Sequence, residues 1–115
     1  MPWTLTVRDG PRVRRERFDA AAPAFDALQA RVDELSAGAP RRTTRALARE
    51  YAPVEQVAAR AELRGPSRLL PTVKGGADVR GDGSVETWTG WLRRNLVEPR
   101  DGERPVQALR RVLGA

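Results

Sequence analysis

A chain of 115 residues without cysteine or histidine cannot form disulfides or thiolate metal sites, and it lacks the commonest general base and transition-metal ligand. Its length suits one domain, residues 1–115, with a single core. The net charge of +6 favours anionic partners, although the 15 carboxylates are interleaved with the basic residues as on an ordinary solvated surface.

The basic residues are almost all arginine, Lys74 being the one lysine. This imbalance is typical of GC-rich coding, but arginine is also the better bidentate partner for phosphate. No apolar run of about eighteen residues occurs, and the N-terminus lacks the order of a secretory signal. We therefore expect a soluble, cytoplasmic protein with no membrane partner.

Two strands are predicted at the start of the chain. In the first, Trp3, Leu5 and Val7 alternate with polar residues, as in a strand with one buried face. Arg12 to Phe18 is predicted as a second strand after a turn at Asp9-Gly10-Pro11. Its dense charge suits an exposed sheet edge, where charge discourages pairing with other chains.

A helix is predicted next, beginning between Asp19 and Ala22 and stopped by Gly38 and Pro40. Its apolar residues recur at helical spacing and predict one buried stripe. They are Phe25, Leu28, Val32 and Leu35.

The segment from Arg41 to Tyr51 fits both a strand and a helix. We favour a strand, because Pro53 would interrupt a helix that carried the pattern onward. Its arginines, beside a tyrosine, make it the best candidate basic patch. Residues 57–64 alternate more cleanly and predict another strand.

The stretch from Gly76 to Val97 predicts a β-hairpin with a long second strand. Asp82-Gly83 between apolar runs is a strong signal for a type I′ turn. With these two residues as the turn, Ala77 faces Trp88 on the core side of the sheet. The opposite side of the second strand then carries Val85, Thr87, Thr89 and Trp91.

A loop longer by one residue would place Val79 opposite Val85 and re-pair the two faces, so this register stays open. After the hairpin, Pro105 suits the first turn of a short amphipathic helix. Such a short helix must dock on the sheet, because it is not stable alone in water.

Together these elements predict an α+β fold with a single antiparallel sheet of about 5–6 strands and two helices packed on one face. The expected order is β-β-α-(β)-β-β-β-α. No phosphate-binding glycine loop is present, and the carboxylates show no clustered spacing. We therefore expect no enzyme activity, no cofactor and no metal.

Two functions fit this composition. The favoured one is a non-catalytic interaction module that forms homo-oligomers through the sheet face carrying Trp91, Val85, Thr87 and Thr89. A second interpretation needs no partner: the loop from Arg68 to Lys74 covers Trp91 within the monomer.

The alternative is a nucleic-acid-binding protein, with Trp91 or Tyr51 as a stacking platform. Its candidate phosphate contacts are Arg12, Arg14, Arg15, Arg17, Arg41, Arg42, Arg45 and Arg49.

Overall fold

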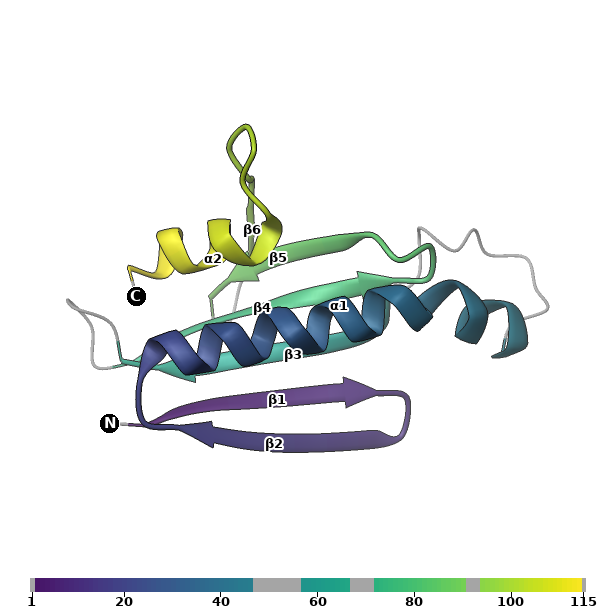
Figure 1. The fold of residues 1–115 in the computed structure, drawn as a ribbon, viewed down its shortest axis with the longest axis horizontal. Helices are drawn as coiled ribbons and strands as arrows, with labels where there is room; N and C mark the ends of the chain where they lie inside the picture. Colours follow the sequence, from purple (N-terminus) through teal and green to yellow (C-terminus); the bar gives the residue numbers. More distant parts are fainter. Residues whose placement is uncertain (1, 47–56, 67–71, 91–93, 115) are drawn as a thin grey trace.

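The structure, a computed structural model, describes residues 2–46, 57–66, 72–90 and 94–114, with the backbone alone at 39–46 and 57–58. Its elements follow the order strand, strand, helix, four strands and helix (Figure 1). They are β1 (Trp3–Asp9), β2 (Arg12–Phe18), α1 (Ala21–Ala46), β3 (Val57–Gly65), β4 (Val73–Arg80), β5 (Val85–Thr89), β6 (Asn95–Val97) and α2 (Pro105–Leu113).

The strands form one six-stranded antiparallel sheet in the order β2-β1-β3-β4-β5-β6. The β1–β2 hairpin lies at one edge and β6 at the other (Figure 1). This arrangement confirms the predicted α+β class, the single antiparallel sheet and the order of the elements.

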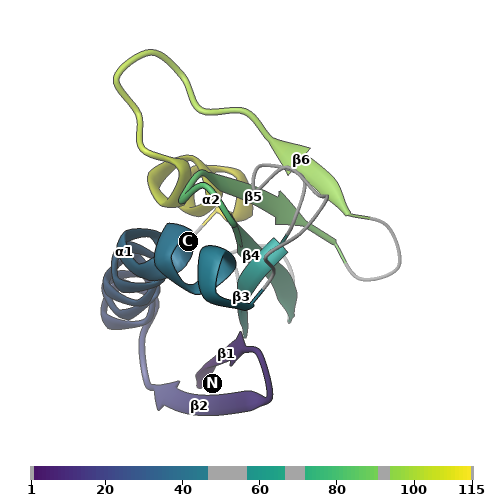
Figure 2. The same ribbon diagram turned by 90° about the vertical axis from the view of Figure 1, so that its right-hand side faces the viewer.

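Gly75 and Gly76 distinguish the two faces of the sheet. A Cβ on Gly75 would lie 2.8 Å from Leu109 of α2, whereas a Cβ on Gly76 would lie 2.6 Å from the indole of Trp88. Because successive residues of a strand point to opposite faces, α2 lies on one face and Trp88 on the other. Helix α1 packs beside α2, so both helices cover the same face (Figure 2).

We call the covered side the helix face and the other side the open face. Residues directly opposite each other on paired strands share a face, so the register assigns the open-face residues. These are Val13, Arg15 and Arg17 on β2, Thr4, Thr6 and Arg8 on β1, Arg60, Glu62 and Arg64 on β3, Lys74, Gly76, Asp78 and Arg80 on β4, Glu86 and Trp88 on β5, and Leu96 on β6.

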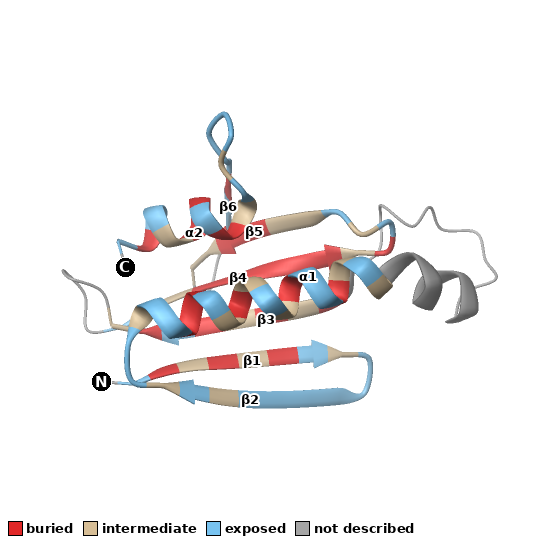
Figure 3. Ribbon diagram, in the orientation of Figure 1, coloured by how far each residue is buried: buried red, intermediate tan, exposed pale blue. Residues whose placement is uncertain are grey.

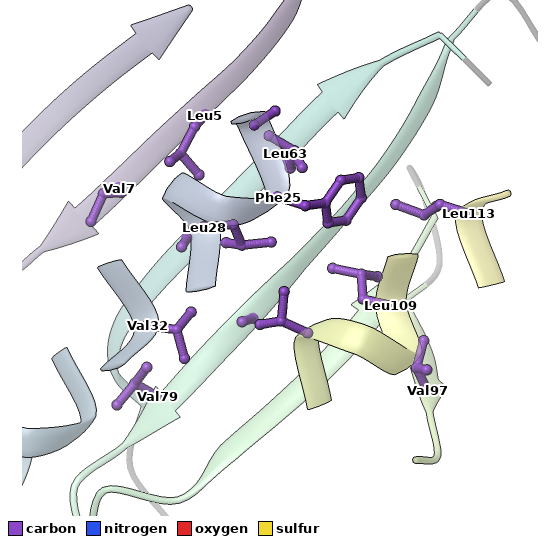
Figure 4. Packing of buried hydrophobic residues seen from close by; sticks show 14 of the residues in the cluster. Leu5, Val7, Phe25, Leu28, Val32, Leu63, Val79, Val97, Leu109 and Leu113 are labelled. Carbon is purple, nitrogen blue, oxygen red and sulfur yellow. The ribbon is translucent and has the colours of Figure 1, made fainter. Parts of the chain in front are cut away.

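The core lies between the helix face and the two helices (Figure 4). The stripe predicted on α1 is buried there, as are Val106, Leu109 and Leu113 of α2, whereas Val112 of α2 is exposed. The rings of Trp3 and Phe25 meet edge to face with their centroids 5.5 Å apart. The core residues labelled in Figure 4 are Leu5, Val7, Phe25, Leu28, Val32, Leu63, Val79, Val97, Leu109 and Leu113.

The favoured register of the hairpin was wrong, and the longer loop is the one that forms. Val79 lies opposite Val85, and the amide of Arg80 donates to the carbonyl of Ser84 at 2.9 Å. A type I′ turn needs positive φ at both central residues, yet at this turn only Gly83 has a positive φ, of 89°. The side chain of Asp82 instead accepts hydrogen bonds from Ser84, which also lower the pKa of its carboxyl.

This change of register exchanges the two faces of β5. Val85, Thr87 and Thr89 therefore lie on the helix face, while Trp88, expected in the core, lies on the open face. The predicted long second strand is also divided, because β5 ends at Thr89 and β6 runs antiparallel to it.

Helix α1 continues past its predicted stop signals. Gly38 and Pro40 lie within it, and the residues of the Arg41–Tyr51 segment up to Ala46 are helical rather than extended. Proline removes one helical hydrogen bond, but its φ of about −65° is compatible with helix, so it marks a weak point and not an obligatory end. The remainder of that segment lies outside the described residues.

Candidate anion-binding surface

Charged residues dominate the open face, and its carboxylates are engaged by cations. Asp78 pairs with Arg60 at 2.6 Å, and Glu86 pairs with Arg80 at 2.8 Å. Glu62 lies 3.7 Å from the ammonium of Lys74. All three ion pairs involve β3, β4 or β5, so the negative charge of this face is neutralised towards the β5 side of the sheet.

The other end of the open face has an excess of positive charge. Arg15 and Arg17 come from the exposed edge strand β2, Arg8 from β1 and Arg64 from β3. Strand β2 is exposed along most of its length (Figure 3). Among the described residues of the open face, positively charged side chains therefore outnumber carboxylates over three neighbouring strands, β2, β1 and β3.

Two cross-strand pairs place like charges directly opposite each other. Arg8 lies opposite Arg60, and Arg64 lies opposite Lys74. Like charges in directly opposed positions destabilise a sheet. Asp78 and Glu62 already neutralise part of this charge through Arg60 and Lys74, and a bound anion would reduce the repulsion further.

A depression of about 250 Å³ lies among these cations. Thr4 and Thr6 of β1 are short side chains between longer ones on the flanking strands, and this difference in length creates the hollow. Thr6 lies opposite Arg15 on one side and Glu62 on the other. The residues that line it are Thr4, Thr6, Arg8, Arg15, Glu62, Arg64 and Lys74.

Trp88 and Asp78 form a buried cluster beside this region. The indole lies over Gly76 and donates from Nε1 to Asp78 Oδ1 at 3.1 Å, while Arg60 donates to both oxygens of that carboxylate. Trp88 is only 1% exposed, and Arg94 lies 4.6 Å from the centroid of its ring. Arg60 and Lys74 also lie over the indole, each at 5.9 Å. Trp88 therefore anchors the open face in this conformation and does not offer a free ring for stacking.

The structure separates the arginines proposed as phosphate contacts. Arg15 and Arg17 lie on the open face, whereas Arg12 and Arg14 point to the helix side of the same strand. Arg41, Arg42 and Arg45 belong to the part of α1 described by its backbone alone, and Arg49 lies outside the described residues.

Three further cations that line the depression were not among the sequence-based candidates: Arg8, Arg64 and Lys74. The available signal was alternation. Arg8 and Arg64 occupy the polar positions of strands whose other positions are apolar, which places them on the solvent side once the strands are recognised. Arg8 comes close to Arg15 through the β1–β2 hairpin, whereas Arg64 does so through the pairing of β3 with β1, which joins segments far apart in the chain.

The described residues proposed for self-association do not lie on the open face of the sheet, where a partner could contact them. Val85, Thr87 and Thr89 lie on the helix face, Thr87 is buried, and its hydroxyl donates to the carbonyl of Pro105 at 3.3 Å. Trp91 lies outside the described residues. Their role in contacting a partner stays a prediction, but the geometric argument for it no longer holds.

Within the described ranges, no group of three or more metal-ligating carboxylates occurs, and no helix is long and apolar enough to cross a bilayer. The three carboxylates of the open face already form ion pairs with Arg60, Lys74 and Arg80. The surface is therefore suited to holding anions through guanidinium, ammonium and hydroxyl donors.

Comparison of the chain with protein-family models, with curated proteins and with solved structures found no match.

Proposed function

We propose that this protein is a non-catalytic module that binds single-stranded nucleic acid along the open face of its sheet. The observation that carries the proposal is the excess of arginine over β2, β1 and β3, with like charges directly opposed in the pairs Arg8–Arg60 and Arg64–Lys74. Opposed like charges weaken a sheet, and a polyanion would reduce their repulsion beyond what the ion pairs of Arg60 and Lys74 achieve.

The spread of the cations favours a ligand with repeated charges. Open-face residues on one strand recur about every 6.5–7 Å, and neighbouring strands are about 4.8 Å apart. Positive groups therefore occur at intervals across several strands rather than at one point. A phosphodiester chain can contact several of these groups at once.

The shape of the surface favours a single strand over a duplex. The major groove of DNA admits one helix or a two-stranded ribbon, and a broad six-stranded sheet exceeds that width. Over residues 21–38, α1 does not offer an alternative reading element, because it packs against the sheet and its exposed side carries Asp26, Asp33 and Glu34. A flexible strand can follow the twisted sheet instead.

The test compares two pairs of substitutions on the same strand with the same change of charge. Binding of a fluorescent twelve-nucleotide oligothymidylate is measured by anisotropy at several salt concentrations. The double variant Arg15→Gln/Arg17→Gln should bind more weakly, and the magnitude of the negative slope of log K against log salt should fall by about 0.7 for each lost contact. The control Arg12→Gln/Arg14→Gln, which alters the helix side of β2, should change both quantities much less.

Equal losses in the two double variants would mean that only net charge matters and would contradict the proposal. Absence of binding by the unaltered protein at low salt would refute it. Sedimentation of the same samples reports on self-association, which we expect to depend little on salt if it uses apolar area.

A further inference from the structure

The depression on the open face differs from the surrounding surface because its cations converge. Its floor is formed by Thr4 and Thr6, with Arg15 on one side and Arg64 on the other. Lys74 lies opposite Arg64, one strand further, and Arg8 lies at the end towards the β1–β2 turn. Donors from four adjacent strands thus surround one small volume.

The donors in this volume are those that bind phosphate oxygens. Guanidinium groups can form two parallel hydrogen bonds to a phosphate, ammonium groups add a point charge, and threonine hydroxyls donate one bond each. Among the lining residues the single carboxylate is Glu62, which lies 3.7 Å from the ammonium of Lys74. The lining as a whole is strongly cationic.

The size and charge of the hollow select a particular kind of phosphate. A volume of about 250 Å³ is below the roughly 300–1,000 Å³ of pockets that enclose drug-sized ligands, so it fits one compact group and not a whole nucleotide. A phosphomonoester carries a charge of about −1.5 to −2 at neutral pH, whereas an internal phosphodiester carries a single charge. Several cations around one small volume favour the group with the higher charge.

We propose that this depression is a phosphomonoester site that holds the phosphorylated end of the nucleic-acid strand. The identity of the strand rests on the function proposed above, whereas the site itself rests on the geometry of the hollow. A terminal phosphate and free inorganic phosphate share the recognised chemistry, so the experiment contains an arm for each.

The first arm compares three oligothymidylates of equal length that carry a 5′-phosphate, a 3′-phosphate or no terminal phosphate. One of the phosphorylated strands should bind about tenfold more tightly or better, as expected for an additional charge-assisted hydrogen bond. Inorganic phosphate should abolish this preference, while sodium chloride of equal ionic strength should reduce it less.

Three substitutions locate the effect. Arg15→Gln should remove the preference for the phosphorylated end, whereas the neighbouring Arg14→Gln, on the other side of β2, should retain it. Glu62→Gln should increase the preference, because it removes a negative charge from the hollow. A residue with a merely structural role would not increase affinity when it is altered.

The outcomes separate the site from the function. Equal binding of all three strands, with binding otherwise intact, overturns the phosphomonoester site and leaves the proposed function standing. Binding of inorganic phosphate that depends on Arg15, without binding of any strand, supports the site and refutes the nucleic-acid function. If neither phosphate nor any strand binds, both proposals are wrong. Since the comparison of strands uses the unaltered protein, it remains decisive even if a variant does not fold.

Discussion

The indole nitrogen of Trp88 donates a hydrogen bond to Asp78 Oδ1 at 3.1 Å, linking β5 to β4 on the open face of the sheet. Asp78 is 6% exposed and also accepts two bonds from Arg60 of β3. One nearly buried carboxylate is thus satisfied by side chains from two neighbouring strands. Because a buried charge without partners is strongly unfavourable, this cluster favours the observed register of β4 and β5.

Replacement of Trp88 by phenylalanine should destabilise the protein. The smaller ring can still lie over Gly76, but the donor to Asp78 is lost, which is expected to lower the free energy of unfolding by about 1–3 kcal/mol. Urea titration measures the change. In an Asp78→Asn background the same replacement should cost less, by at least about 0.5 kcal/mol, and strict additivity of the two substitutions would contradict the proposed coupling.

Gly76→Ala should be unfavourable although glycine is normally a poor strand residue. The added methyl group would lie 2.6 Å from the indole of Trp88 and 2.7 Å from the carbonyl oxygen of Ala61, so the ring or the backbone must move. We expect a loss of about 1–3 kcal/mol in unfolding free energy, together with a change in tryptophan fluorescence. A gain of stability, as for a glycine in open space, would show that the close approach of the ring is wrong.

The ion pair between Glu103 and Arg111 should make stability depend on pH in the acid range. Hydrogen bonds from Arg111, with a further bond from the amide of Arg100, lower the pKa of Glu103 to about 2, and the same pair raises the pKa of Arg111. Since the folded-state pKa of Glu103 is the lower one, this contribution is complete above the usual carboxyl pKa of about 4.5 and is lost as the pH falls towards 2.

The measurement is the urea midpoint of the unaltered protein and of Glu103→Gln across this range. The difference between the two proteins should be largest above about pH 5 and should shrink as the pH approaches about 2. Because other carboxylates titrate in both proteins, only the difference reports on Glu103. A difference that stays constant with pH would contradict the assigned role of the pair.

Ser36 connects α1 to the turn between β4 and β5, because its hydroxyl donates to the carbonyl of Gly83. Ser36→Ala should lower the free energy of unfolding by about 0.5–1.5 kcal/mol and should speed hydrogen exchange at the turn amides of Gly83 and Ser84. Gln29→Ala provides a control on the same helix, since its exposed bond to Asp33 contributes only about 0.2–0.5 kcal/mol. Unchanged exchange at the turn would show that this contact does not hold it.

Much of the fold follows from local patterns in the chain. The alternation at Trp3, Leu5 and Val7 and the helical spacing from Phe25 to Leu35 both predict residues that are buried in the structure. These patterns succeed because burial against a single core imposes a period of two on a strand and 3.6 on a helix. The density of charge on β2 predicted all four of its arginines as phosphate contacts without separating Arg15 and Arg17 from the others, and that role stays a prediction.

The error at the hairpin arose because one residue in the loop decides the outcome. With Asp82-Gly83 as a two-residue turn, Trp88 belongs to the core, whereas one more residue in the loop places it on the open face. Both alternatives fit the local sequence, since each leaves an apolar set on either side of β5. The partners that distinguish them, Asp78 and Arg60, belong to other strands.

The sequence alone therefore determined the class of fold, the order of its elements and the chemical character of each strand, because these depend on composition and on periods within short segments. The tertiary structure decided which side of the sheet each residue of β5 faces and which cations share a hollow. Those properties depend on strand pairing, which brings Arg15, Arg64 and Lys74 together from distant parts of the chain. A local pattern indicates which residues of one strand share a face, but not which strand pairs with it or in what register.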